Sequence, residues 1–162
     1  MKRTIFALIL VTAAGCYNEK VAVRSYIDEA IGLTETFLYS GVTLGTTIGP
    51  WLNGEPVNIG EVKRAYESFS QGIKNASTRI REMRCPNNKL ALALQKELFA
   101  YLDFEEEFAG ELSIVCDTIE NNNPADPRTI QVTLSRVQAL MARESALRDR
   151  LNTLAGRAGN QW

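Results

Sequence analysis

The sequence predicts an all-α protein, an antiparallel up-down-up-down four-helix bundle that follows an N-terminal signal segment. Three observations favour this fold. Apolar residues recur at alternating spacings of three and four through most of the chain, which is the pattern of helices with one buried face. No stretch shows the alternation of apolar and polar residues that half-buried strands require. Short connections between the expected helices make neighbouring helices antiparallel.

The first expected helix covers residues 20–48. Its apolar positions are Val23, Ile27, Ala30, Phe37, Leu44 and Ile48. Glycine recurs every fourth residue near its end, at Gly41, Gly45 and Gly49. Because each glycine costs a soluble helix about 1 kcal/mol, three in register indicate close backbone approach. One interpretation is a membrane-inserting or oligomerising segment; the other, which we favour, is tight packing against a neighbouring helix.

A loop over residues 49–57, which holds two prolines, leads to the second expected helix at 59–84. That helix has the most regular apolar stripe of the chain, formed by Ile59, Val62, Tyr66, Phe69, Ile73, Ala76, Ile80 and Met83. Asn58 and Glu61 have the spacing of a capping box at its start. Pro86 marks its end, because a proline disfavours helical geometry in the residue before it.

The third and fourth helices are expected at residues 87–119 and 127–154. The third carries Leu94, Leu98, Tyr101, Phe104, Phe108, Leu112 and Val115 on one face. The fourth begins at Asp126 and Pro127, which suit the N-cap and the first helical position. Its apolar positions are Ile130, Leu134, Val137, Leu140, Leu147 and Leu151.

Composition excludes several classes of function. The chain has no histidine, which removes the Ser-His-Asp triad, the commonest metal ligand and haem ligation through imidazole. The net charge is −1, and it becomes −3 once residues 1–15 with Lys2 and Arg3 are removed. No basic face favours nucleic acid as a partner. We therefore expect no enzyme, no cofactor and no metal.

The first fifteen residues have the layout of a secretion signal. Lys2 and Arg3 form a positive start, residues 5–11 are an uninterrupted apolar run, and small residues occupy positions 13–15. The apolar run is too short for a membrane-spanning helix, which needs about 20 apolar residues.

The end of this signal resembles the lipobox of bacterial lipoproteins. The motif here is Ala-Ala-Gly-Cys over residues 13–16, with Ala13 where the family usually has leucine. The resemblance implies cleavage before Cys16 and lipidation of its thiol, which leaves residues 16–162 as one helical bundle domain. The alternative is an ordinary signal that is cleaved near Gly15 and leaves Cys16 unmodified. Tyr17 after the cysteine, in place of the aspartate that retains enteric lipoproteins in the inner membrane, favours the periplasmic side of the outer membrane.

The two other cysteines are not expected to pair within one chain. Cys85 precedes the third helix and Cys116 lies near its far end, which separates them by about 43 Å along the helix. A disulfide requires Cα atoms within about 7 Å. We interpret Cys116 as a small core residue, and Cys85, in a turn, is free to link two chains.

The acidic cluster of the third helix has two interpretations. Its members are Asp103, Glu105, Glu106, Glu107 and Glu111. Oxygen ligands at this density suit a divalent metal, but a solvated face is the simpler reading. Folding the second and third helices about residues 85 and 86 sets Lys63 and Arg64 level with Glu107, and folding the third and fourth about residue 124 sets Arg143 level with Glu105. Ion pairs between helices then account for the acids.

Glu144 interrupts the apolar stripe of the fourth helix. The same folding places it level with Glu105 and Tyr66, opposite Gly41. A carboxylate among apolar neighbours has a raised pKa and is a candidate for function, so Tyr66, Glu105 and Glu144 form the candidate ligand site. The simpler interpretation is that Glu144 leans outward to Arg143 or Arg148.

Two functions are compatible with these features. The first is a non-enzymatic interaction or assembly module of the cell envelope, held at the membrane through Cys16, with a helical face or the Trp51 loop against a protein partner. The second is a bundle that binds a small ligand, or senses one, in its core. A cavity in the middle of the bundle would favour the second, and a solid core with an exposed apolar patch would favour the first.

Overall fold

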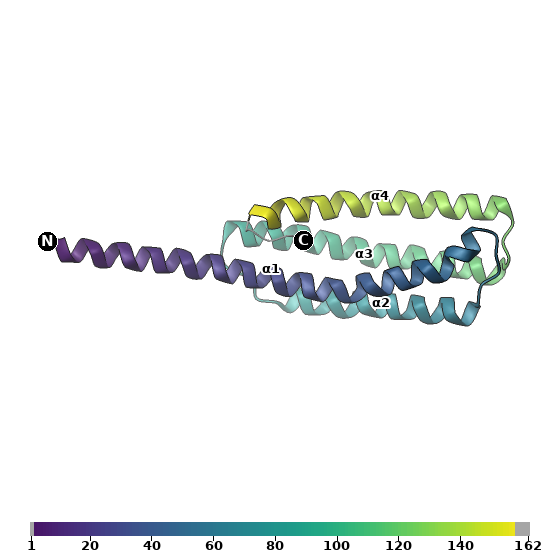
Figure 1. The fold of residues 1–162 in the computed structure, drawn as a ribbon, viewed down its shortest axis with the longest axis horizontal. Coiled ribbons are helices and arrows are strands. Elements are labelled where there is room, and N and C mark those ends of the chain that lie inside the picture. Colours follow the sequence, from purple (N-terminus) through teal and green to yellow (C-terminus); the bar gives the residue numbers. More distant parts are fainter. Residues whose placement is uncertain (1, 158–162) are drawn as a thin grey trace.

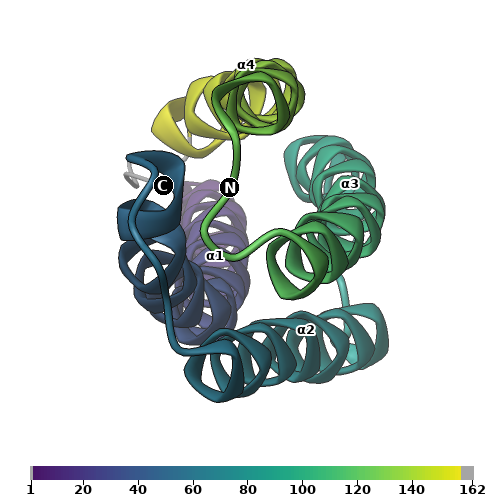
Figure 2. The same ribbon diagram turned by 90° about the vertical axis from the view of Figure 1, so that its right-hand side faces the viewer.

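The computed structural model confirms the all-α four-helix fold. It describes the backbone of residues 2–157 and the side chains of residues 19–157, and within these ranges every regular element is a helix. The helices are α1 (Lys2–Leu52), α2 (Ile59–Glu82), α3 (Lys89–Asn121) and α4 (Pro127–Arg157), and they run alternately up and down (Figure 1). Seen along the bundle, α1 lies between α2 and α4 and diagonally across from α3 (Figure 2).

Polar side chains cap three of the helices. Asn58 accepts a hydrogen bond from the backbone N–H of Glu61 and donates one to the Glu61 carboxylate, at 3.3 and 3.2 Å, as the capping-box spacing predicts. Asp126 accepts from the backbone N–H groups of residues 128 and 129 and so starts α4 as predicted. At the start of α3 the cap is Asn88, so this helix begins two residues later than expected.

The predicted loop at residues 49–57 is wrong in its first part, because α1 continues through Pro50 to Leu52. Trp51 lies in this last turn, is completely buried, and donates a hydrogen bond from its indole Nε1 to the backbone oxygen of Asn122 at 2.6 Å. This contact with the end of α3 holds the final turn of α1 in place despite the proline. Trp51 is therefore part of the core, and the exposed Trp51 loop that the sequence suggested does not exist.

The α2–α3 pair has a different register from the one predicted. Lys63 lies 2.7 Å from Glu120, far along α3 from the Glu107 level that the hairpin arithmetic gave. The reason is the linker 83–88, which begins and ends in extended conformation instead of turning tightly. Its length along the bundle lets α3 start about three helical turns beyond the end of α2.

The α3–α4 register is close to the prediction. Arg143 pairs with Glu107 at 2.7 Å, about half a turn from the expected Glu105, and Arg150 lies 3.9 Å from Glu97. The short connection between the two helices leaves little room for a shift. Folding α3 and α4 about residue 124 therefore predicts the register of this helix pair to within about half a turn.

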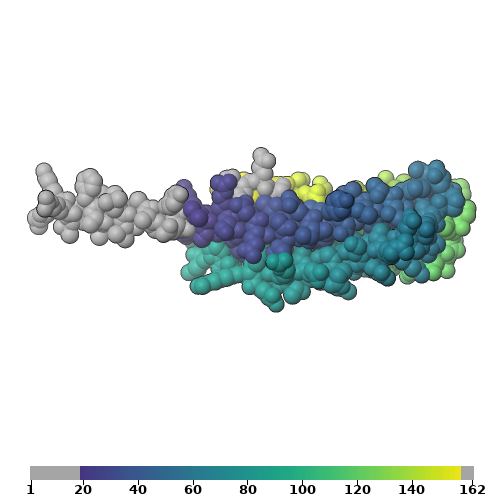
Figure 3. Space-filling model, turned by 60° about the horizontal axis from the view of Figure 1, so that its bottom comes forward, coloured from purple at the N-terminus to yellow at the C-terminus, as the bar shows by residue number. Residues whose placement is uncertain are grey.

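The contact between α1 and α2 is the most extensive of the bundle, and the two helices lie side by side along the face shown in Figure 3. A Cβ atom built on Gly41 would lie 3.1 Å from the Phe69 ring, and one built on Gly72 would lie 3.1 Å from Cβ of Phe37. At Gly45 and Gly49 an added Cβ would meet no atom within 4 Å. Of the three glycines Gly41, Gly45 and Gly49, only Gly41 shows the expected tight packing. Among the described residues, no helix combines the length and the apolarity needed to cross a membrane.

Candidate functional site

An apolar groove runs between α1 and α4. It arises because α1 packs mainly against α2 and only sparsely against α4. Its cavity volume is about 320 Å³, at the lower end of the range of small-molecule pockets. The apolar side chains that line it include Leu38 and Val42 of α1, Val137 and Met141 of α4, and, from the two helices behind, Phe69 and Phe108.

The rim of the groove is unusually apolar for a solvent-facing position. Val42 on α1 is 66% exposed and Met141 on α4 is 56% exposed, and both line the groove. Gly45 of α1 also lines the groove, and a Cβ atom added there would meet no atom within 4 Å. These residues leave an apolar surface that the chain itself does not cover.

Glu105 on α3 lies in the floor of this groove. It is 2% exposed and is the one charged residue that is buried among the side chains from 19 to 157. Its Oε1 atom has no hydrogen-bond partner in the described part of the chain. The pKa of Glu105 is raised to about 7, chiefly by burial and then by the neighbouring charge of Glu144, against the lowering effect of the Tyr101 hydroxyl and the Arg148 charge. A carboxyl group in this state exchanges its proton near neutral pH.

Glu144 and Arg148 on α4 complete the polar end of the groove. They form an ion pair one helical turn apart, at 2.7 Å between the Glu144 carboxylate and the Arg148 guanidinium. The Glu144 side chain is 18% exposed and that of Arg148 is 41% exposed. Glu144 therefore leans toward an arginine, as its simpler interpretation expected, while it stays close enough to Glu105 to act on its pKa.

Tyr101 is the site residue that the sequence interpretation missed. It lies one turn before Glu105 on α3 and is 1% exposed, and its hydroxyl group forms no hydrogen bond of normal geometry among the described residues, although it lies near enough to Glu105 to lower the pKa of that carboxyl. Burial, followed by the charge of Glu105, raises the pKa of this phenol well above its usual range. Its position four residues before an acid on the same stripe was the available signal, and it was read only as a core position.

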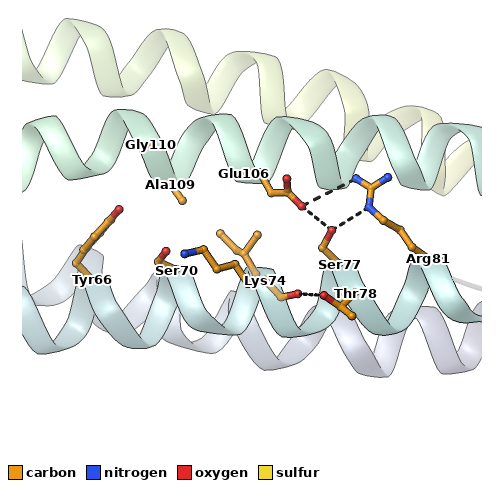
Figure 4. Close-up of a pocket in the computed structure, with 10 residues that line it drawn as sticks. Tyr66, Ser70, Lys74, Ser77, Thr78, Arg81, Glu106, Ala109 and Gly110 are labelled. Carbon is orange, nitrogen blue, oxygen red and sulfur yellow. Dashed lines mark hydrogen bonds and ion pairs between the residues drawn. The ribbon is translucent and has the colours of Figure 1, made fainter.

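Tyr66 does not lie with Glu105 and Glu144. It lines a separate groove between α2 and α3, whose cavity volume is about 480 Å³ (Figure 4). The predicted grouping of Tyr66 with the two glutamates is therefore wrong for this residue. The shifted α2–α3 register is the cause, because it moves Tyr66 along α3, away from the level of Glu105.

Four polar side chains at one end of the α2–α3 groove, those of Ser77, Thr78, Arg81 and Glu106, already have partners. Ser77 donates a hydrogen bond to Glu106 at 2.5 Å, and Arg81 donates from its Nε to the Ser77 hydroxyl at 3.1 Å (Figure 4). Arg81 also pairs with Asp103. No buried polar atom of the residues drawn in Figure 4 lacks a hydrogen-bond partner. A ligand in this groove would therefore find no unpaired buried group.

The rest of the acidic cluster of α3 is also engaged in ion pairs. Glu107 accepts two hydrogen bonds from Arg143, and Glu111 pairs with Arg136. Among the described side chains, no three metal-ligating residues come together. Glu105 alone in the cluster lacks a cationic partner at ion-pair distance in this part of the chain.

Cys85 and Cys116 are both free thiols. Cys85 lies in the linker between α2 and α3, and Cys116 lies five residues before the end of α3. Both are half-buried, and burial raises the pKa of each thiol, to about 11 for Cys116. Cys116 packs against the core, as expected of a small buried residue.

The chain was also compared with known proteins. No family model, curated protein or solved structure matches it. Cys16, the expected lipidation site, falls in the helical backbone of α1, but its side chain lies outside the described residues.

Proposed function

We propose that this protein is a lipid-anchored module of the bacterial cell envelope that acts by binding a partner and catalyses no reaction of its own. The observation that carries the proposal is the continuity of α1. The lipobox-like residues 13–16 lie on the same helix that forms one side of the bundle. A lipid on Cys16 then fixes the bundle at the membrane by a stiff connection instead of a flexible linker.

The continuity of α1 fixes the distance between Cys16 and the α1–α4 groove. At 1.5 Å per residue, Gly45 in the α1–α4 groove lies about 44 Å along the helix from Cys16. The exposed apolar surface of the bundle would thus be presented well away from the headgroups of the lipid. A partner in the envelope would meet that surface in the aqueous space, with the periplasmic side of the outer membrane as the proposed location.

The anchor is tested by Cys16→Ser. The variant should leave the membrane fraction and lose incorporation of a labelled fatty acid, because the thiol that forms the thioether is gone. Cys85→Ser is the matched control and should change neither readout. Fatty-acid labelling that persists in the Cys16 variant would contradict the lipoprotein assignment.

Partner binding is tested with a photo-crosslinking residue placed in cells at two exposed apolar positions. Tyr39 on α1 is 77% exposed and Val132 on α4 is 65% exposed. A crosslinked species of defined mass should form at one of them and disappear in the Cys16→Ser background, because the partner shares the membrane location. The buried position Leu98 serves as the control that should give no adduct. Identical adducts with and without the anchor would contradict a membrane-bound partner.

A second candidate function, ligand binding within the bundle, is favoured by one specific observation. Glu105 is a buried carboxyl group that lines a cavity and has an unpaired oxygen. Buried polar groups in native proteins almost always have a hydrogen-bond partner, so an orphaned one asks for an explanation.

A further inference from the structure

We propose that the α1–α4 groove binds a small organic cation, a primary amine on an apolar chain, and that Glu105 holds its ammonium group. The inference goes beyond the anchoring function and does not depend on it. Its starting point is the carboxyl group of Glu105, which is 2% exposed, lines the groove and has no cation at ion-pair distance among the described residues. Its Oε1 atom is completely buried and accepts no hydrogen bond of normal geometry in that part of the chain. Burial of a carboxyl group without a cationic partner costs the fold desolvation energy, and an ammonium group that reaches the carboxyl from the groove would offset part of this cost.

The charges around Glu105 select a cation over an anion. The guanidinium of Arg148 is the only positive group among the described residues that line the groove, and it already pairs with Glu144 at 2.7 Å. With Glu105 ionised, the polar end therefore holds two carboxylates against one cation. An anionic ligand would meet a net negative site, whereas an ammonium group would bring it to neutrality. Hydrogen bonds between charged groups are also about twice as strong as those between neutral groups.

The shape of the groove selects an apolar chain behind that head group. Glu105, Glu144 and Arg148 gather at one end of the lining, near Leu38. Toward the other end the lining becomes wholly apolar, through Leu112 and Val137 to Ile48. A linear amine would place its nitrogen at Glu105 and its carbon chain along these side chains, where burial of apolar surface favours binding.

Binding of a cation to this site should depend on pH. The titratable and charged groups that face Glu105 are Tyr101 on its own helix and Glu144 and Arg148 on α4, and the α1 and α2 residues of the lining are all apolar or glycine. Because the pKa of Glu105 is raised to about 7, the carboxyl is neutral in mildly acidic solution. An ammonium ligand prefers the ionised form, so its affinity should rise as the pH increases through 7.

The test is a calorimetric titration of the full chain, in a neutral detergent, with n-hexylamine, n-hexanol and hexanoate, against a detergent-only blank. The amine remains protonated from pH 5.5 to 8.5. At pH 8 we expect the amine to bind at least tenfold more tightly than the alcohol, and hexanoate to bind most weakly. We also expect amine affinity to fall as the pH is lowered through 7 and alcohol affinity to stay constant.

Two variants assign the effect to the proposed residue. Glu105→Gln should abolish the preference for the amine and its pH dependence. Glu107→Gln is the matched control, because Glu107 lies two residues further on the same helix and pairs with Arg143 on the surface. It should leave both unchanged. A thermal melt checks that each variant is folded. Equal affinity for amine and alcohol, no binding of the amine, or a preference that survives Glu105→Gln would each overturn the proposal.

Discussion

The two sides of α1 differ sharply in how they meet their neighbours. On the side of α2, the Phe69 ring lies over Gly41, and the Cβ and backbone of Phe37 lie against Gly72. On the side of α4, the glycine at position 45 faces open space, and the two helices leave a groove. A glycine of α1 therefore allows close packing at position 41, whereas at position 45 it leaves space unfilled.

This difference shows that glycine spacing does not by itself determine how closely two helices pack. Close approach at α1–α2 occurs because the Phe69 ring fills the space at Gly41, and because Gly72 has no side chain to keep the backbone of α1 at Phe37 away. At α1–α4 no ring enters the space at Gly45. The stability of the bundle should accordingly depend strongly on the first interface and weakly on the second.

The largest effect is expected from truncating a buried residue of the α1–α2 interface. Phe37 is completely buried, and Phe37→Ala should lower the free energy of unfolding by about 3–5 kcal/mol, through lost burial and the cavity left beside the Tyr101 ring. Tyr39→Ala, two residues away and 77% exposed, should change it by less than about 0.5 kcal/mol. Urea denaturation of both variants gives the comparison. Similar losses in the two would contradict the assigned faces of α1.

The next effect concerns the pH dependence of stability through Glu105. Its pKa is raised from 4.5 to about 7 in the fold, so the fold favours the protonated form. The unfolded chain releases this proton above pH 4.5. The contribution of Glu105 to the free energy of unfolding is therefore lost as the pH rises from 4.5 to 7. The loss amounts to roughly 3 kcal/mol at 1.36 kcal/mol per pH unit. The difference in unfolding free energy between the natural chain and Glu105→Gln should show this decline, and a constant difference would mean that Glu105 is not desolvated.

A smaller effect is expected from substituting alanine for a glycine, and its sign should differ between Gly45, which faces open space, and Gly72, which is in close contact. Gly45→Ala should raise the free energy of unfolding by about 0.5–1 kcal/mol, because alanine is the better helix former and its Cβ meets nothing within 4 Å. Gly72→Ala should lower it by about 1 kcal/mol, because the new Cβ would lie 3.3 Å from Cα of Phe37, a backbone atom of a buried helix. Thermal melts should show a more stable Gly45→Ala and a less stable Gly72→Ala. A change of stability in the same direction for both would contradict the difference between the two interfaces.

The smallest effect is expected for Glu144→Leu in the groove. The change removes a partly exposed ion pair, which is worth little, and it continues the apolar wall of α4. Arg148 stays solvated because its side chain is 41% exposed. The net change in unfolding free energy should stay within about 0.5 kcal/mol. A loss above about 1.5 kcal/mol would show that Glu144 supports a buried network instead of the rim of a groove.

Much of the fold could be predicted because its determinants are local. The stripe of α2 and the caps at Asn58 and Asp126 depend on residues three or four positions apart. The α3–α4 register followed from the short connection between these helices. These features require no knowledge of distant contacts.

The errors arose where a distant contact overrides a local pattern. Pro50 predicted a loop, but the hydrogen bond from Trp51 to Asn122 holds the helical turn there. The predicted turn at residues 85 and 86 is wrong, because the six-residue linker 83–88 begins and ends in extended conformation. That error placed Tyr66 beside Glu105, whereas Glu105 and Glu144 were correctly placed in one site. Tyr101 was missed for another reason, because its place on the apolar stripe of α3 predicts a core residue.

The extended linker also gives the molecule two ends of different construction. Arg81, in the last turn of α2, lies over the ring of Phe99, so α3 residues before this level have no α2 beside them. There the missing corner is filled by the linker itself, whose Cys85 packs against the core. Cys116 lies near the opposite end, between full-length helices. The rate at which each thiol reacts with one reagent would report how often its end of the bundle opens. The natural cysteines would therefore distinguish local opening of one end from global unfolding, without any added label.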